Sequence, residues 1–189
     1  FQTDNVLITG NVISGTSTNA IVGDPPDAAI LNVGGLAGYT GTNWTATNNT
    51  LLNLGTAAFF IDNFFDASSI DGVTISGNTV TVNTSLLADG TSVFDVRGTL
   101  GTTTNVNISQ NTLNLTGTVG TGVAGVYGVG VQGGVQDVTL SANTLRGGNP
   151  GGAGSASLPP SSGVFIDSDT ATTDLNLTAE SNFISGWAN

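Results

Sequence analysis

The stretch Val73-Thr-Ile75-Ser-Gly-Asn78-Thr-Val80 decides the fold, because its pattern occurs six times along the chain. Apolar residues stand at its first, third and eighth positions, and an Asn stands at the sixth. Alternation of apolar and polar residues is typical of a β-strand with one buried side. The other copies place Asn11, Asn49, Asn111, Asn143 and Asn182 at the sixth position. A strand pattern that recurs at a nearly constant distance predicts a solenoid, with one coil per repeat.

A second apolar phrase lies between successive copies of the first. Its five occurrences are Ile30–Val33, Phe60–Asn63, Val93–Val96, Val126–Val129 and Phe165–Ser168. When these are aligned on their third residue, the distance to the next Asn is always 15 to 17 residues. The distance from an Asn to the next second phrase varies from 13 to 24 residues. We therefore expect one arc of each coil to be fixed in length and the other to hold longer loops, chiefly at 14–29 and 144–163.

These repeats predict one all-β domain over residues 1–189, a parallel solenoid of five to six coils without an α-helical domain. No repeat contains a ten-residue helical pattern, which disfavours a leucine-rich-repeat horseshoe. An antiparallel sandwich is the alternative. It would require hairpins about every 8–12 residues and would leave the constant interval unexplained.

The two alternating apolar residues followed by an Asn resemble the right-handed parallel β-helix repeat of the pectate lyase-like superfamily. The resemblance extends from Val6 to about Trp187. It implies that the six Asn form a ladder at the bend between two sheets, where their amides satisfy backbone groups that the bend leaves free. It also implies a left-handed backbone at the bend, which Asn tolerates.

The apolar positions of the first phrase define the expected core, with three Phe residues of the second phrase as aromatic neighbours. The core prediction comprises Val6, Ile8, Ile13, Val73, Ile75, Val80, Val106, Ile108, Leu113, Val138, Leu140 and Leu145, together with Phe60, Phe94 and Phe165. Trp44 lies within a core phrase and should be buried, whereas Trp187 could cover the last coil.

Composition excludes several classes of partner and of chemistry. Charged residues make up 8% of the chain, and 13 Asp and Glu against two Arg give a formal charge of −11. A chain with so few cations cannot neutralise phosphates, which excludes nucleic acid and anionic membrane surfaces. No apolar run reaches the roughly 18 residues of a membrane span. The absence of Lys, Cys and His excludes Schiff-base, thiol and histidine-dependent sites.

The residual catalytic candidates are Asp62, Asp95 and Arg97. The alignment of the second phrase places Asp62, Asp95 and Asp167 in one column, which predicts Asp62 and Asp95 on adjacent coils about 5 Å apart. That separation suits a pair of glycosidase carboxylates, and Arg97 could lower the pKa of Asp95. The resemblance implies a polysaccharide-active enzyme or a carbohydrate-binding module as the alternative function. The simpler interpretation is that these residues cap turns and balance charge.

Calcium is the one candidate cofactor. Asp24 and Asp27 flank two prolines, and Asp167 and Asp169 form an Asp-Ser-Asp cluster, so both groups offer oxygen ligands. The chain lacks the periodic nonapeptide of calcium-binding β-rolls. Metal binding is therefore an optional property in this interpretation.

The sequence favours a structural function. The first phrase begins at Val6 and the last ends near Ile184, so we expect both ends to expose apolar core and unpaired strand edges. The chain is then either a processed or excised piece of a longer protein or a subunit that associates with copies of itself into filaments. A Thr- and Asn-rich acidic chain without Lys is typical of secreted microbial surface proteins, so we expect an extracellular adhesin or matrix protein.

Overall fold

A computed structural model of the chain describes residues 2–14, 28–33, 37–55, 57–63, 67–87, 90–119, 125–151, 161–167 and 175–187. Every strand pairing in these ranges is parallel. The described residues contain no α-helix, and their one helical element is a 3-10 turn, η1 (Thr84–Leu86). The predicted all-β parallel solenoid is therefore confirmed.

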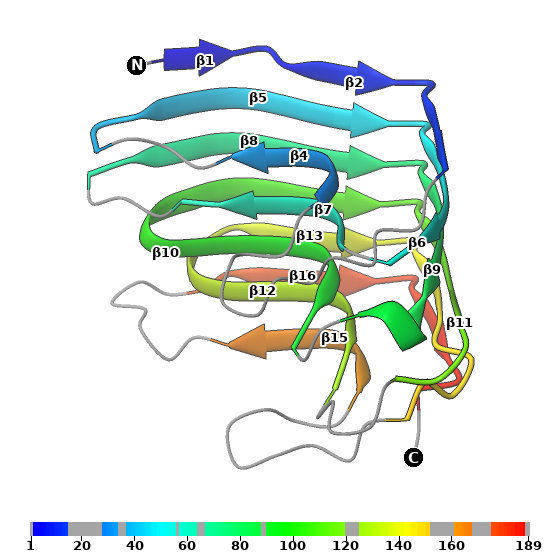
Figure 1. Ribbon diagram of the computed structural model, residues 1–189. Coiled ribbons are helices and arrows are strands. Elements are labelled where there is room, and N and C mark those ends of the chain that lie inside the picture. Colours follow the sequence, from blue (N-terminus) through cyan, green and yellow to red (C-terminus); the bar gives the residue numbers. More distant parts are fainter. Residues whose placement is uncertain are drawn as a thin grey trace.

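The strands form three stacks, and each turn of the chain visits them in sequence (Figure 1). The first stack contains β1 (Gln2–Asp4) with β2 (Leu7–Thr9), β5 (Thr40–Thr47), β8 (Ser69–Ser76), the second half of β10 (Ser92–Ser109), β13 (Val138–Ser141) and β16 (Leu177–Glu180). The second contains β3 (Val12–Ser14), β6 (Thr50–Leu54), β9 (Thr79–Asn83), β11 (Thr112–Thr116), β14 (Thr144–Arg146) and β17 (Phe183–Ser185). The third contains β4 (Ala28–Val33), β7 (Ala57–Asp62), the first half of β10, β12 (Tyr127–Val135) and β15 (Ser162–Asp167). The solenoid has about four turns, where the sequence predicted five to six coils.

The six phrase Asn form the predicted ladder between the first and second stacks. In each coil, the backbone N–H and the side-chain amide of the Asn both donate to the Oδ1 of the Asn in the next coil, at 2.9–3.1 Å. The same amide also donates to a backbone carbonyl of the preceding coil, as Asn111 does to Ile75 O at 2.8 Å. The four interior Asn are buried. The ladder thus satisfies backbone groups at the bend of each coil from Asn11 to Asn143.

The left-handed backbone lies one residue before each ladder Asn, not on the Asn itself. The residues concerned are Gly10, Asn48, Gly77, Gln110, Ala142 and Ser181, with φ between 53° and 68°. This corrects the expectation drawn from the resemblance. The preceding residue makes the turn, which leaves the Asn in position to bond along the stack.

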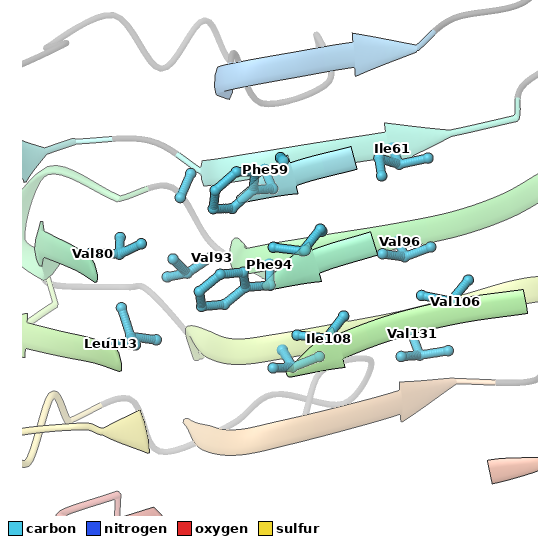
Figure 2. Close-up of a cluster of buried hydrophobic side chains, with 14 of the residues drawn as sticks. Phe59, Ile61, Val80, Val93, Phe94, Val96, Val106, Ile108, Leu113 and Val131 are labelled. Atoms are coloured by element: carbon cyan, nitrogen blue, oxygen red, sulfur yellow. The ribbon is translucent and has the colours of Figure 1, made fainter. Parts of the chain in front are cut away.

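The predicted core is confirmed in the interior coils (Figure 2). Its members from Val73 to Leu145 are at most 2% exposed. Val6, Ile8 and Ile13 are only partly buried, because their coil has a neighbour on one side.

The aromatic part of the core prediction is confirmed for Phe60 and Phe94, which are both fully buried. Phe94 stacks on Phe59 with ring centroids 5.4 Å apart, and Phe60 lies beneath the guanidinium of Arg97. Phe165 is only partly buried and stacks on Tyr127, with centroids 4.4 Å apart.

Both Trp residues are buried, at 8% exposure for Trp44 and 7% for Trp187. The indole N–H of Trp187 donates to Leu145 O, and its ring lies where side chains at Gly147 and Gly128 would otherwise stand. Trp187 therefore fills core space that glycines leave open near the last coil.

Strand β10 turns a corner that joins the third stack to the first. Its residues from Phe94 to Arg97 pair with β7, and its residues from Thr102 pair with β8. At the corner, the N–H groups of Leu100 and Gly101 donate to the carbonyl of Asn63, and the Thr103 hydroxyl donates to the carbonyl of Arg97. This corner fixes the chain directly after the candidate residues.

Candidate functional site

The predicted column of Asp62, Asp95 and Asp167 is wrong, because the two strands pair with a different register. Asp62 lies beside Arg97, and Asp95 lies beside Phe60. Further along the stack, Arg97 pairs with Gln132, which pairs with Asp167. Asp62 and Asp167 thus share a column with a cation between them along the stack.

The error has a physical cause. The sequence alignment matched Ile61 with Phe94, whereas the structure matches Phe59 with Phe94. A slip of two residues keeps every side chain on its own face of the sheet, so alternation cannot detect it. The parallel stacking of the Phe59 and Phe94 rings selects the observed register.

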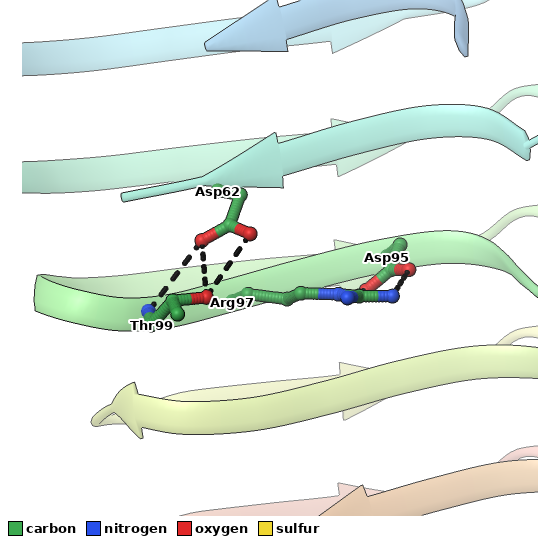
Figure 3. Close-up of polar contacts among 4 residues, drawn as sticks. All are labelled: Asp62, Asp95, Arg97 and Thr99. Atoms are coloured by element: carbon green, nitrogen blue, oxygen red, sulfur yellow. Dashed lines mark hydrogen bonds and ion pairs between the residues drawn. The ribbon is translucent and has the colours of Figure 1, made fainter. Parts of the chain in front are cut away.

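Asp95 and Arg97 project from the same side of β10 and form a two-point ion pair (Figure 3). Arg97 Nε donates to Asp95 Oδ1 at 2.9 Å, and Arg97 Nη2 donates to Asp95 Oδ2 at 2.6 Å. The Asp95 side chain is fully buried, while that of Arg97 is 24% exposed. The guanidinium lies 5.4 Å from the ring centroid of Phe60, within cation–π range.

Asp62, at the end of β7, is held by Thr99 from the next coil (Figure 3). The Thr99 hydroxyl lies 2.8 and 3.1 Å from the two carboxylate oxygens, and the Thr99 N–H donates to Oδ1 at 3.4 Å. Thr99 was not among the residues predicted for this site. Its one sequence signal is Gly98, the last residue before β10 turns the corner that carries Thr99 back over Asp62.

Burial dominates the electrostatics of the site. It raises the pKa of the Asp62 carboxyl above its ordinary value of 3.8, against the hydrogen bond from Thr99 and the charge of Arg97. It also raises the pKa of Asp95, although the ion pair with Arg97 opposes the rise and the charge of Asp62 adds to it. Burial works to lower the pKa of Arg97, but its bonds to Asp95 and the charge of Asp62 raise it overall.

The arrangement joins adjacent coils rather than presenting reactive groups. Both oxygens of Asp95 are bonded to Arg97, and Asp62 and Asp95 have no exposed surface. Two carboxylates share one guanidinium, so the cluster has an excess of negative charge within the protein. Such a cluster links β7 to β10 through the bonds between Asp62 and Thr99.

The calcium candidates remain predictions. Asp24, Asp27 and Asp169 lie outside the described residues. Asp167 is described, at the end of β15. Within the described ranges, no three Asp or Glu side chains gather into a group that could hold a metal ion.

Of the long loop predicted at 14–29, only residues 14, 28 and 29 are among those the structure describes. Of the loop predicted at 144–163, residues 144–151 and 161–163 are described, and this segment begins with strand β14.

No helix in the described part of the chain has the length and apolar character needed to cross a membrane. Comparison with protein families, with curated proteins and with solved structures finds no match to this chain.

Proposed function

We propose that this chain is a structural or adhesive protein of a microbial surface or extracellular matrix, which assembles end to end through its terminal coils. One observation carries the proposal: large apolar side chains are exposed at both ends of the stack. Leu7 and Val12 are 65% and 73% exposed in the first coil, and Phe183 and Ile184 are 55% and 47% exposed in the last. Unpaired strand edges with apolar side chains are templates for further pairing.

The architecture supports a building role. Each coil buries its apolar side only by contact with a neighbour, so stability grows with the number of stacked coils. We also place the fold with the right-handed parallel β-helices of the pectate lyase-like superfamily. The stacked Asn and the constant arc of 15 to 17 residues support that assignment.

The composition supports a secreted protein that associates with copies of itself rather than one that binds charged ligands. The chain has two cations against 13 acids, and one of the cations, Arg97, is paired within the protein. The outward column of the second stack consists of Thr in the four interior coils, from Thr50 to Thr144. A neutral hydroxyl surface suits an extracellular rod.

Electron microscopy and sedimentation velocity over a concentration series, with and without Ca²⁺, test the proposal. We expect elongated particles whose length grows with concentration. A monomer at every concentration would contradict self-assembly. Turnover of acidic or neutral polysaccharides that disappears in a folded Asp95→Asn variant would instead support the enzymatic alternative.

A further inference from the structure

The Asn ladder has unlike ends. Each interior Asn accepts at Oδ1 from the preceding coil and donates its backbone N–H to the following coil. At the first coil, Asn11 Oδ1 has no donor among the described residues. At the last coil, Asn182 donates its side-chain amide to Leu140 O, and its backbone N–H has no acceptor in the described part of the chain. One end of the ladder therefore offers an acceptor and the other a donor.

The side-chain amide of Asn11 donates to a different carbonyl from that used by the other ladder Asn. In the later coils the ladder amide donates to the carbonyl three residues before the preceding Asn, for example Asn49 to Ile8 O at 3.0 Å. No coil precedes that of Asn11 among the described residues, and the Asn11 amide donates to Thr9 O of its own coil at a longer 3.2 Å. A coil placed before it would offer the better acceptor.

We propose that two copies of this chain join head to tail, with the last coil of one stacked on the first coil of the next in the register of the ladder. This inference rests on the proposed function and adds the polarity and the register of the junction. Asn182 of one copy donates to Asn11 Oδ1 of the next, which repeats the interior pattern. The Asn11 amide then donates to Ala179 O, the carbonyl three residues before Asn182.

The side chains at the two ends match in this register. Val12, the Thr of the interior coils and Phe183 belong to one outward column of the second stack. Only the two terminal positions of this column are apolar, so the junction places Phe183 against Val12. Ile13 and Ile184 likewise occupy the two ends of one column.

Among the described residues, Glu180 of the last coil meets a neutral partner at the junction. Glu180 extends the column that begins at Thr9, so the junction places its carboxylate beside a hydroxyl side chain. Because the two joined surfaces differ, the contact is heterologous, and repetition of it produces an open filament instead of a closed dimer.

Two variants that block opposite ends test the inference. Val12→Asp places a carboxylate on the first coil, and Phe183→Asp places one on the last. Both side chains are more than half exposed, so each variant should keep the fold, which circular dichroism and thermal unfolding would check. Sedimentation velocity is then measured for the wild type, for each variant alone and for an equal mixture.

Head-to-tail joining predicts that the wild type forms oligomers and that each variant alone sediments as a monomer of 18.8 kDa. The equal mixture should give particles of twice that mass and no larger, because each variant retains one open end. Dimers of either variant alone would show like ends joining and would overturn the inference, while the proposed assembly would stand. A mixture that stays monomeric while the wild type associates would overturn the register. A monomeric wild type would overturn both proposals.

Discussion

At the scale of single residues, the ladder Asn and the Asp62–Arg97–Asp95 cluster contribute differently to stability. Each interior Asn lies at a bend and joins three successive coils through its own amide. The cluster links β7 to β10 and leaves two carboxylates with one cation. The interior ladder Asn have both their amide and their backbone N–H hydrogen-bonded, whereas the cluster retains a charge imbalance. Removal of an interior ladder Asn and removal of the Asp62 charge should therefore have opposite effects on stability.

Asn111→Ala should lower the free energy of unfolding by about 3 kcal/mol, because it leaves two buried donors of Asn78 and the buried Ile75 carbonyl without partners. Asn11→Ala is the matched control. It removes an exposed Asn at the open end of the ladder and should cost less than about 1 kcal/mol. Urea unfolding of both variants measures the difference, and equal losses would argue against a ladder that stabilises through burial.

Asp62→Asn should raise the melting temperature at pH 7. The pKa of Asp62 is raised in the folded state, so between pH 3.8 and that raised pKa the folded protein binds more protons than the unfolded chain. The contribution of this group to stability is therefore complete below pH 3.8 and is lost as the pH rises through the folded pKa. The gain in the variant should shrink as the pH falls toward 3.8.

Asp71→Asn is the control of opposite sign. Hydrogen bonds from Asn105 and Thr104 lower the pKa of Asp71, so its contribution is present above pH 3.8 and is lost as the pH falls through the lowered value. This variant should melt at a slightly lower temperature at pH 7. Scanning calorimetry from pH 3 to pH 8 compares the two, and a lower melting temperature for Asp62→Asn at pH 7 would contradict the assignment.

Arg97→Met should cost about 3–5 kcal/mol, because it leaves the buried Asp95 carboxylate without its cation. The double variant Asp95→Leu/Arg97→Met removes both charges and should recover most of that loss. A thermal-unfolding double-mutant cycle measures the coupling. Independent effects of the two substitutions would show that the pair does not act as a unit.

At the scale of elements, the corner of β10 determines how the third stack continues into the first. The glycines of two coils meet there, and a Cβ at Gly133 would stand 2.8 Å from Gly98 O. The close approach lets β10 and β12 turn together, and it places Thr99 over Asp62. The corner therefore sets the geometry of the candidate site.

Gly133→Ala should destabilise the protein by about 2 kcal/mol or more, through both its left-handed φ of 68° and the contact with the facing strand. Gly10→Ala shares the φ of 68° but has nothing within 4 Å of the added Cβ. The difference between their melting temperatures isolates the steric part. If Gly10→Ala is as damaging as Gly133→Ala, the close packing at the corner is not what matters.

The repeats predicted the solenoid, the ladder and the interior core correctly, because one phrase encodes burial, bend and spacing together. They could not predict the pairing register of β7 with β10, since a slip of two residues preserves the alternation and only the Phe59–Phe94 stacking distinguishes the choices. Thr99 was missed for a related reason. Its contact with Asp62 depends on where β10 bends, which no local pattern specifies.

At the scale of the whole molecule, the chain is a stack of coils with one direction, and its two ends are complementary in the proposed assembly. Six ladder Asn are joined by five links within one copy, and a head-to-tail junction adds the sixth link at the same spacing. Because stacked strands are about 4.8 Å apart, six steps give an axial repeat of roughly 29 Å per subunit.

The axial repeat of the assembled protein is the most direct test of this account. Concentrated wild-type protein would be imaged by electron cryomicroscopy, and filament images would be analysed for their layer spacings. We predict a strong layer spacing of about 4.8 Å between stacked strands and a subunit repeat of roughly 29 Å. All subunits of a filament should point the same way. Particles that stay single, or filaments whose subunits alternate in direction, would contradict it.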